Sequence, residues 1–231
     1  MERREGQDPE YVRGAFARIC KRYSLANHLL SMGTDILWRR KVGRLVAEHK
    51  PGRILDVATG TGDLALELQR SCPGAEVTGA DFCEEMLELA RDRGLKKSLV
   101  ADGLELPFAD NSFDAVTVAF GLRNMSDWKK GLQEMSRVVR PSGLVLVLDF
   151  SLPEGLLRRP YAFYLNRILP RVAGLLTGQR DAYDSLAGSV ERFPSGGEML
   201  DLLGEAGLHE RAWKPLTQGI ASIYTGKGPA E

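Results

Sequence analysis

A glycine-rich loop, LDVATGTGDLA at residues 55–65, carries the strongest chemical signal in the sequence. Gly60 and Gly62 have no Cβ, so the backbone can approach a ligand closely at these positions. An apolar run, 53–58, leads into the loop and a helical pattern, 63–70, follows it, which is the order of a nucleotide-binding strand, loop and helix. A tight turn that holds no ligand is the simpler interpretation of the same residues.

Acidic residues suit this loop to a nucleoside. Asp81 ends a second apolar run, EVTGAD, about twenty residues beyond the loop, where an acid accepts hydrogen bonds from ribose hydroxyls. Asp56 lies on the approach to the loop, where it could face an ammonium group. Asp102 follows a third short strand and could accept a hydrogen bond from an adenine amino group. Because the loop and Asp81 occur together, a bound nucleoside is favoured over an empty turn.

Two cofactors fit the loop. Residues 60–65, GTGDLA, match the GxGxxA form of the dinucleotide fingerprint, which indicates a nicotinamide cofactor and an oxidoreductase. Asp63, in the first turn of the helix, would repel a pyrophosphate docked at the same helix end. S-adenosylmethionine instead carries a sulfonium and an ammonium, which acidic neighbours stabilise. The pattern favours S-adenosylmethionine, and the nicotinamide cofactor remains the alternative.

A second polar group, Arg123 and Asn124, follows the apolar run FDAVTVAF at 113–120. A guanidinium stays charged at neutral pH and offers a fork of donors, so Arg123 could stabilise a developing oxyanion but is a poor general base. An ion pair from Arg123 to an acid such as Asp81 or Asp102 is the alternative role, and the two roles could coexist. Asn124 could hold a second polar edge of a ligand.

Asn124 has a simpler alternative role at the start of the next helix. Asparagine favours the N-cap position, and Ser126 and Asp127 are the other candidates for the same cap. The choice among the three decides whether the Asn124 side chain is left for a ligand.

Strand and helix patterns alternate from residue 52 onward and place these polar groups together. Strands separated by helices indicate right-handed parallel crossovers and an open α/β sheet, whose ligands bind at the carboxyl ends of the strands. Two closing runs, HERAWKPL and GIASIYTG, leave only a short turn between them and predict an antiparallel hairpin. Strands are expected at 53–58, 76–81, just before Asp102, 113–120, 143–150, 209–216 and 219–226, and helices at 10–23, 35–49, 63–70, 84–94, 127–140 and 195–208.

The chain divides into two expected parts. Residues 1–50 form a helical cap that contributes to a substrate site, and residues 51–231 form the cofactor-binding domain. The alternating pattern breaks at about 151–193, an aromatic, basic and mostly helical segment. We expect this segment to be an insertion that covers the carboxyl ends of the strands.

Composition narrows the class of protein. Lys+Arg and Asp+Glu both number 31, and this balance does not favour a nucleic-acid partner. The charged first twelve residues do not resemble a secretory signal, and the apolar runs are far too short to span a membrane, which predicts a cytoplasmic protein. The three cysteines form no CxxC pair and the three histidines are scattered, so no protein-bound metal is expected.

Over roughly residues 14–227 the chain resembles the UbiE/MenG family of class I S-adenosylmethionine-dependent methyltransferases. The resemblance rests on YSLANHLLSMGTDILWRR (23–40), LDVATGTGDL (55–64), LPFADNSFDAVTVAFGLRN (106–124), RVVRPSGLVLVLDFS (137–151) and the segment 169–194. It implies an α/β fold with a Rossmann-like open sheet, mostly parallel with an antiparallel last strand, and helices on both faces. Thr61, Asp81, Asp102 and Gly103 fall at the family's cofactor positions. The expected cofactor site is Asp56, Gly60, Thr61, Gly62, Asp81, Asp102 and Gly103.

The resemblance implies methylation of a ring carbon of a prenylated hydroquinone, and we favour demethylmenaquinol over the equivalent ubiquinone precursor. A phenol of pKa about 10 is mostly neutral at pH 7, so the ring must be activated by partial or full deprotonation. Arg123 and Asn124 are the expected catalytic residues, because they could stabilise the phenolate oxygen. S-adenosylmethionine is the cofactor, and neither a metal nor a second cofactor is required.

Three residues, Tyr23, Asn27 and Tyr183, are expected to contact the substrate. Tyr23 and Asn27 lie four apart and could share a helix face towards the pocket, or form a local packing and capping pair. The general base stays open among Tyr183, Asp181, His28 and bound water. Ser24, Ala119 and Ser185 depart from the family pattern.

The segment 151–193 mixes aliphatic and aromatic residues with arginines such as Arg158, Arg159, Arg167 and Arg171. This mix suits a prenyl groove or a peripheral contact with an anionic membrane. A homodimer interface or ordinary helix packing explains it equally well. A binding protein that has lost catalysis is a further alternative to the enzyme.

Overall fold

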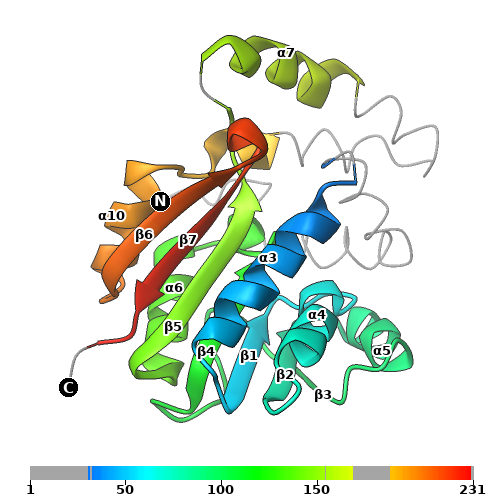
Figure 1. Cartoon of the computed structure of the whole chain (residues 1–231), viewed down its shortest axis with the longest axis vertical. Coiled ribbons are helices and arrows are strands. Elements are labelled where there is room, and N and C mark those ends of the chain that lie inside the picture. The colour runs from blue at the N-terminus through cyan, green and yellow to red at the C-terminus, as the bar shows by residue number, and fades with distance from the viewer. Residues whose placement is uncertain (1–30, 32, 154, 169–187, 230–231) are drawn as a thin grey trace.

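The computed structural model describes residues 31, 33–153, 155–168 and 188–229. Its centre is a seven-stranded sheet in the order β3-β2-β1-β4-β5-β7-β6 (Figure 1). Strands β1 to β5 are parallel, β7 is antiparallel to β5, and β6 is antiparallel to β7. The strands are β1 Arg53–Val57, β2 Glu76–Asp81, β3 Lys97–Val100, β4 Phe113–Ala119, β5 Val139–Phe150, β6 His209–Leu216 and β7 Ala221–Lys227.

Helices cover both faces of the sheet, as the sequence predicts. One face packs against α3 Asp35–Glu48, α4 Asp63–Ser71 and α5 Glu84–Asp92, and the other against α6 Trp128–Val138 and α10 Gly197–Glu205 (Figure 1). The two faces follow from the alternation of a strand, because Ile54 points to the first core and its neighbour Leu55 to the second. The expected mostly parallel α/β sheet with an antiparallel strand beside β5 is confirmed.

The closing hairpin also forms as predicted. Residues of β6 and β7 pair from Leu216 with Ala221 to His209 with Lys227. The connection is the tight turn η6 Thr217–Gly219, where Thr217, Gln218 and Gly219 all take positive φ values of 45°, 56° and 92°. β7 is therefore inserted between β5 and β6, and its direction reverses relative to the five parallel strands.

One expected boundary is wrong. The sequence places a helix at 127–140 and begins the next strand at 143, but α6 ends at Val138 and β5 begins at Val139. Val139 is fully buried and pairs with Phe113 of β4, which brings the chain into the sheet before Pro141. Regular pairing resumes at Leu144 with Ala115 after a register shift. Burial of Val139 therefore outweighs the turn signal of Pro141–Gly143.

The segment after β5 is described only in part. It contains η4 Gly155–Leu157, helix α7 Arg158–Phe163 and the π-helical turn η5 Tyr164–Ile168, which lie beyond the carboxyl end of β5 (Figure 1). Tyr161 and Leu165 face the core and are buried. The expected helix at 10–23 lies outside the described residues. The division at residue 50 into a cap and a cofactor domain remains a proposal.

Candidate functional site

The glycine loop follows β1 and begins α4. Gly60 and Gly62 have φ values of 56° and 81°, in the left-handed region that glycine adopts without a Cβ clash. Gly62 is the N-cap of α4, and a Cβ added there would lie 3.0 Å from the Cβ of Ala90. The loop therefore needs glycine both for its backbone conformation and for its close approach to α5.

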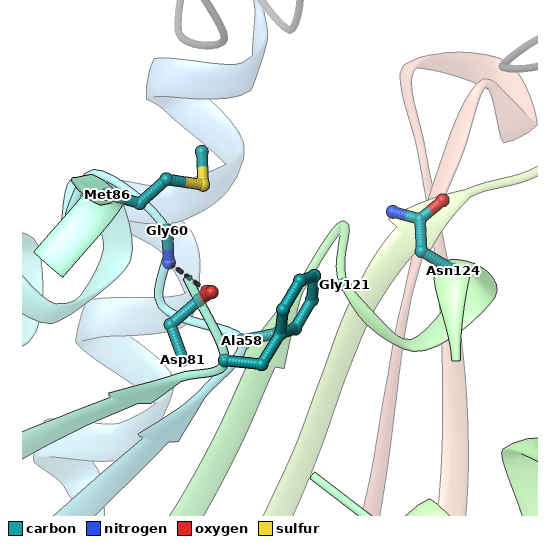
Figure 2. Close-up of a pocket in the computed structure, with 7 residues that line it drawn as sticks. Ala58, Gly60, Asp81, Met86, Gly121 and Asn124 are labelled. Atoms are coloured by element: carbon teal, nitrogen blue, oxygen red, sulfur yellow. Dashed lines mark hydrogen bonds between the residues drawn. The ribbon is translucent and has the colours of Figure 1, made fainter. Parts of the chain in front are cut away.

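Asp81, the last residue of β2, holds this loop in place. Its Oδ2 accepts a hydrogen bond of 2.8 Å from the Gly60 amide (Figure 2). Its Oδ1 accepts one of 3.0 Å from the Cys83 amide. The residue is only 4% exposed. Burial raises the pKa of the Asp81 carboxyl, and the backbone hydrogen bonds from Cys83, Gly60 and Phe82 oppose that rise. Each carboxylate oxygen can still accept a further bond from a ligand hydroxyl.

A first pocket opens above Asp81, between the loop and the end of β4. Its walls are apolar at Phe82 and Met86, and its polar groups are the Asp81 carboxylate and the Asn124 amide. An apolar slot beside a buried carboxylate suits a nucleoside, whose base packs and whose ribose donates hydrogen bonds. The lining residues are Ala58, Gly60, Asp81, Phe82, Met86, Gly121 and Asn124 (Figure 2).

A second, smaller pocket shares Ala58 with the first and lies by the loop and α3. It is more polar and combines a guanidinium, two carboxylates and two hydroxyls. Such a charge pattern suits a zwitterionic group, and its place beside the nucleoside pocket fits the amino-acid end of S-adenosylmethionine. The lining residues are Arg39, Asp56, Ala58, Thr59, Thr61, Asp63, Leu64 and Ala119.

Asp56 is a strongly perturbed carboxyl group of this second pocket. The Thr59 and Thr117 hydroxyls donate hydrogen bonds of 2.6 Å and 2.7 Å to it, and Thr117 is its register partner on β4. Burial raises the pKa of Asp56 to about 6, although both hydroxyls and the Arg39 charge act in the opposite direction. A cationic ligand group would therefore gain strongly from this carboxylate.

Asp63 also borders the second pocket, and its surroundings weaken one argument made from the sequence. Its Oδ1 forms an ion pair of 2.6 Å with Arg93, and its Oδ2 lies 3.9 Å from Arg39. The two arginines reduce the repulsion that this acid would exert on a pyrophosphate. The choice between the cofactors therefore rests on the two pockets rather than on Asp63.

Asp102 and Gly103 are not among the residues that line either pocket. Asp102 is exposed, and its Oδ1 accepts a 2.9 Å hydrogen bond from the Leu104 amide. Gly103 packs below Met125, whose Cε would lie 2.8 Å from an added Cβ. Their contact with a cofactor remains a proposal.

Arg123 is fully buried and forms an ion pair of 2.7 Å with Asp149 near the end of β5. It also donates a 2.6 Å hydrogen bond to the Phe120 carbonyl, and its Cζ lies 5.3 Å from the Phe150 ring centroid. The ion-pair role considered for Arg123 is confirmed, but its partner is Asp149 rather than Asp81 or Asp102. Asp149 takes their place because β4 and β5 are adjacent parallel strands whose ends lie side by side.

Asn124 ends the short turn η3 Leu122–Asn124 and lines the first pocket (Figure 2). Its Nδ2 donates a 3.3 Å hydrogen bond to the Phe120 carbonyl. Helix α6 is capped instead by Asp127, whose side chain accepts a 2.9 Å bond from the Lys130 amide. The capping role considered for Asn124 is wrong, and its amide remains at the pocket.

The expected substrate residues Tyr23, Asn27 and Tyr183, with His28 and Asp181, lie outside the described residues. Sequence reasoning missed Arg39, Phe82 and Met86. Phe82 follows directly after β2, so a strand-end rule would include it, whereas Met86 lies in the first turn of α5. Arg39 comes from a helix before the sheet begins, and although it lies in the stretch 23–40 that carries the family resemblance, that stretch did not assign it a role.

Two features are absent from the described part of the chain. None of its helices is long and apolar enough to cross a membrane. Its His, Cys, Asp and Glu side chains form no group of three or more that could hold a metal ion.

In sequence, the chain is similar to known methyltransferases. A model of the ubiE/COQ5 methyltransferase family matches residues 4–228. A demethylmenaquinone methyltransferase of Thermus thermophilus is 47% identical over 220 residues, which cover 93% of this chain and all of the relative. A ubiquinone/menaquinone biosynthesis C-methyltransferase UbiE of Geobacter sulfurreducens is 43% identical over 94% of this chain and 88% of its own.

Solved structures share the fold at low identity. A S-adenosylmethionine-dependent methyltransferase of Thermotoga maritima, described as a possible histamine N-methyltransferase, has a TM-score of 0.69 at 20% identity over 94% of this chain and 99% of its own. A Haemonchus contortus phosphoethanolamine N-methyltransferase 2, in complex with S-adenosyl-L-methionine, has a TM-score of 0.57 at 17% identity over 77% of this chain and 48% of its own.

We expect Asp149→Asn to destabilise the protein by about 3–5 kcal/mol in urea denaturation, because it removes the carboxylate that faces the buried Arg123. The matched control is Glu205→Gln, which breaks the exposed ion pair with Lys129 and should cost less than about 1 kcal/mol. The double variant Arg123→Met, Asp149→Leu should recover most of the loss. An Asp149→Asn variant as stable as the unchanged protein would contradict this role of the pair.

As the pH rises, the unchanged protein without ligand should lose stability relative to the Asp56→Asn variant. The folded-state pKa of Asp56 is raised to about 6 from an ordinary 3.8, so its contribution is present at low pH and disappears as the pH passes 6. The stability difference should change by about 1.4 kcal/mol between pH 5 and pH 8 in favour of the Asn variant. Urea denaturation at the two pH values measures it, and an unchanged difference would show that Asp56 titrates normally.

Proposed function

The chain belongs to the ubiE/COQ5 methyltransferase family, and from this membership we propose that it methylates a ring carbon of demethylmenaquinol. It is a S-adenosylmethionine-dependent methyltransferase of quinone biosynthesis, and its substrate is a prenylated quinone in reduced form. The observation that supports the naphthoquinone is the 47% identity to a demethylmenaquinone methyltransferase along that relative's whole length. The equivalent ubiquinone precursor is the second candidate, because other relatives carry both names.

The two pockets fit the halves of S-adenosylmethionine. Asp81 would accept hydrogen bonds from the ribose hydroxyls, and Phe82 and Met86 would pack against the adenine. Asp56 would face the ammonium group in the second pocket. When bound there, the cofactor supplies an electrophilic methyl group on its sulfonium. The shared residue Ala58 lies between the two halves.

The protein must also activate the ring that receives the methyl group. A quinol hydroxyl has a pKa of about 10, so a donor that stabilises its deprotonated oxygen makes the ring carbon more nucleophilic. We assign this contact to Asn124, whose amide lines the first pocket. The preceding residue, Arg123, is buried in an ion pair with Asp149. Its proposed role is to fix the η3 turn, rather than to remove a proton.

Methyl transfer from labelled S-adenosylmethionine to a short-chain demethylmenaquinol tests the function. The unchanged protein should transfer label, and Asp81→Ala should lose both cofactor binding and transfer, because it removes the ribose acceptor and releases Gly60. Asn124→Ala should weaken cofactor binding much less than Asp81→Ala does and lose most of kcat. Calorimetry with NADH is the control for the oxidoreductase alternative.

The results of that experiment separate the alternatives. Tight binding of NADH alone would contradict the methyltransferase. Tight binding of S-adenosylmethionine without transfer to either quinol would favour a binding protein that has lost catalysis. Faster transfer to a demethylated ubiquinone precursor would replace the naphthoquinone with the second candidate.

We further propose that the segment 155–168 contacts an anionic membrane surface, where a prenylated substrate resides. Leu156 is 96% exposed and Phe163 is 61% exposed, in a segment that also exposes Leu157 and Ile168. Arg158, Arg159 and Arg167 are exposed among them, and the segment contains no Asp or Glu. Exposed apolar residues interleaved with cations are typical of helices that lie in a lipid interface.

Vesicle sedimentation tests this contact. The protein should bind vesicles of anionic phosphatidylglycerol and bind phosphatidylcholine vesicles much less. Leu156→Glu with Phe163→Glu should abolish the binding, whereas Val100→Glu, at another exposed apolar residue, should retain it. If the double variant instead changes a dimer to a monomer in light scattering and vesicle binding is absent, the segment is a homodimer interface.

A further inference from the structure

Arg39 is a buried arginine of the second pocket to which the sequence analysis assigned no role. It lies in α3 and is 6% exposed, and its Cζ lies 5.1 Å from the Phe120 ring centroid. It borders the pocket together with Asp56, Thr59 and Thr61. A buried guanidinium beside two threonine hydroxyls is a ready contact for an anionic ligand group.

The hydrogen bonds of Arg39 use only one side of its guanidinium. Nη1 donates to Asp35 Oδ2, within α3. Nη2 lies 3.9 Å from Asp63 Oδ2, which is beyond hydrogen-bond distance. Nε is buried, and none of the described residues accepts a hydrogen bond from it. Towards the described residues, the Nε–Nη2 edge, which is a bidentate edge of the arginine fork, therefore makes no hydrogen bond.

The charges of the pocket restrict what this edge can bind. A simple anion near Arg39 would also face the carboxylates of Asp56 and Asp63. A zwitterion avoids that conflict, because its ammonium can face Asp56 while its carboxylate faces the guanidinium. The amino-acid end of S-adenosylmethionine has both charges on one carbon, at the spacing of an α-amino acid.

We propose that Arg39 binds the α-carboxylate of the cofactor through Nε and Nη2. The site would thereby distinguish S-adenosylmethionine and its demethylated product from adenosine thioethers and sulfonium compounds without a carboxylate. A ligand carboxylate also supplies the acceptor that the buried Nε lacks. This inference rests on the proposed cofactor, but not on the identity of the quinol.

Decarboxylated S-adenosylmethionine is the direct probe, because it lacks the carboxylate and retains the sulfonium, the ammonium and the nucleoside. Calorimetry should show that the unchanged protein binds S-adenosylmethionine about 30- to 100-fold more tightly than this probe. In Arg39→Met the affinity for S-adenosylmethionine should fall to that for the probe, whose own affinity should change less than about threefold. Arg39→Lys, which keeps the charge but loses the fork, should discriminate at an intermediate level.

Two controls separate ligand contact from folding. Arg39→Met leaves Asp35 without its arginine, so the double variant Asp35→Asn, Arg39→Met is measured as well and should show the same loss of discrimination. Arg93→Met removes an arginine that donates to the Thr61 carbonyl and pairs with Asp63 but is not among the pocket-lining residues. It should weaken both ligands by the same factor.

Two outcomes would overturn the role of Arg39. The first is that the unchanged protein binds S-adenosylmethionine and its decarboxylated form equally. The second is that the Arg39 variants lose affinity for both ligands by the same factor. Failure of the proposed function gives different results. If the unchanged protein binds neither ligand, the result contradicts both the proposed cofactor and the proposed carboxylate contact. Discrimination that depends on Arg39, with no methyl transfer to a quinol, supports the contact and contradicts only the function.

Discussion

The hydrogen bond from the Gly60 amide to Asp81 links two neighbouring parallel strands at their carboxyl ends. It fixes the loop after β1, and with it the wall between the two pockets. The bond depends on the sheet order, which places β1 beside β2, and on the positive φ of Gly60. Because the same carboxylate is 4% exposed and lines the first pocket, the proposed ligand contact and the loop conformation depend on one group. Loss of Asp81 would therefore remove both together.

The Arg123–Asp149 ion pair likewise links the chain that follows β4 to the end of β5. Both side chains are fully buried, so the pair holds the strand ends together with almost no contact with solvent. Removing one partner of a buried ion pair costs more stability than the intact pair contributes, because the remaining partner is left as an unpaired buried charge. The pair is also nearly neutral, and this limits how much Arg123 can stabilise a distant phenolate. A direct hydrogen-bond donor such as Asn124 is then needed at the pocket.

Local patterns predicted most of the fold and the centre of the site. Alternating strands and helices gave the sheet class, and the glycine spacing located the loop and Asp81. The partner of Arg123 could not be found in this way, because Asp149 lies inside an apolar strand and becomes a neighbour only through the pairing of β4 with β5. The predicted start of β5 was wrong for a related reason, because burial of Val139 outweighed a local turn signal. Arg39 joins the site through the packing of α3, which no short motif encodes.

The second pocket is lined by charged groups of both signs, and a bound ligand would change their balance. In the free protein burial raises the pKa of Asp56 to about 6, so part of this carboxyl is protonated in mildly acidic solution. An ammonium beside it would favour the ionised form and lower that pKa, so cofactor binding would release a proton below about pH 7. A carboxylate beside Arg39 would at the same time offset the added positive charge. The pocket therefore fits a zwitterion better than either charge alone, and this is the physical basis for choosing S-adenosylmethionine over a dinucleotide here.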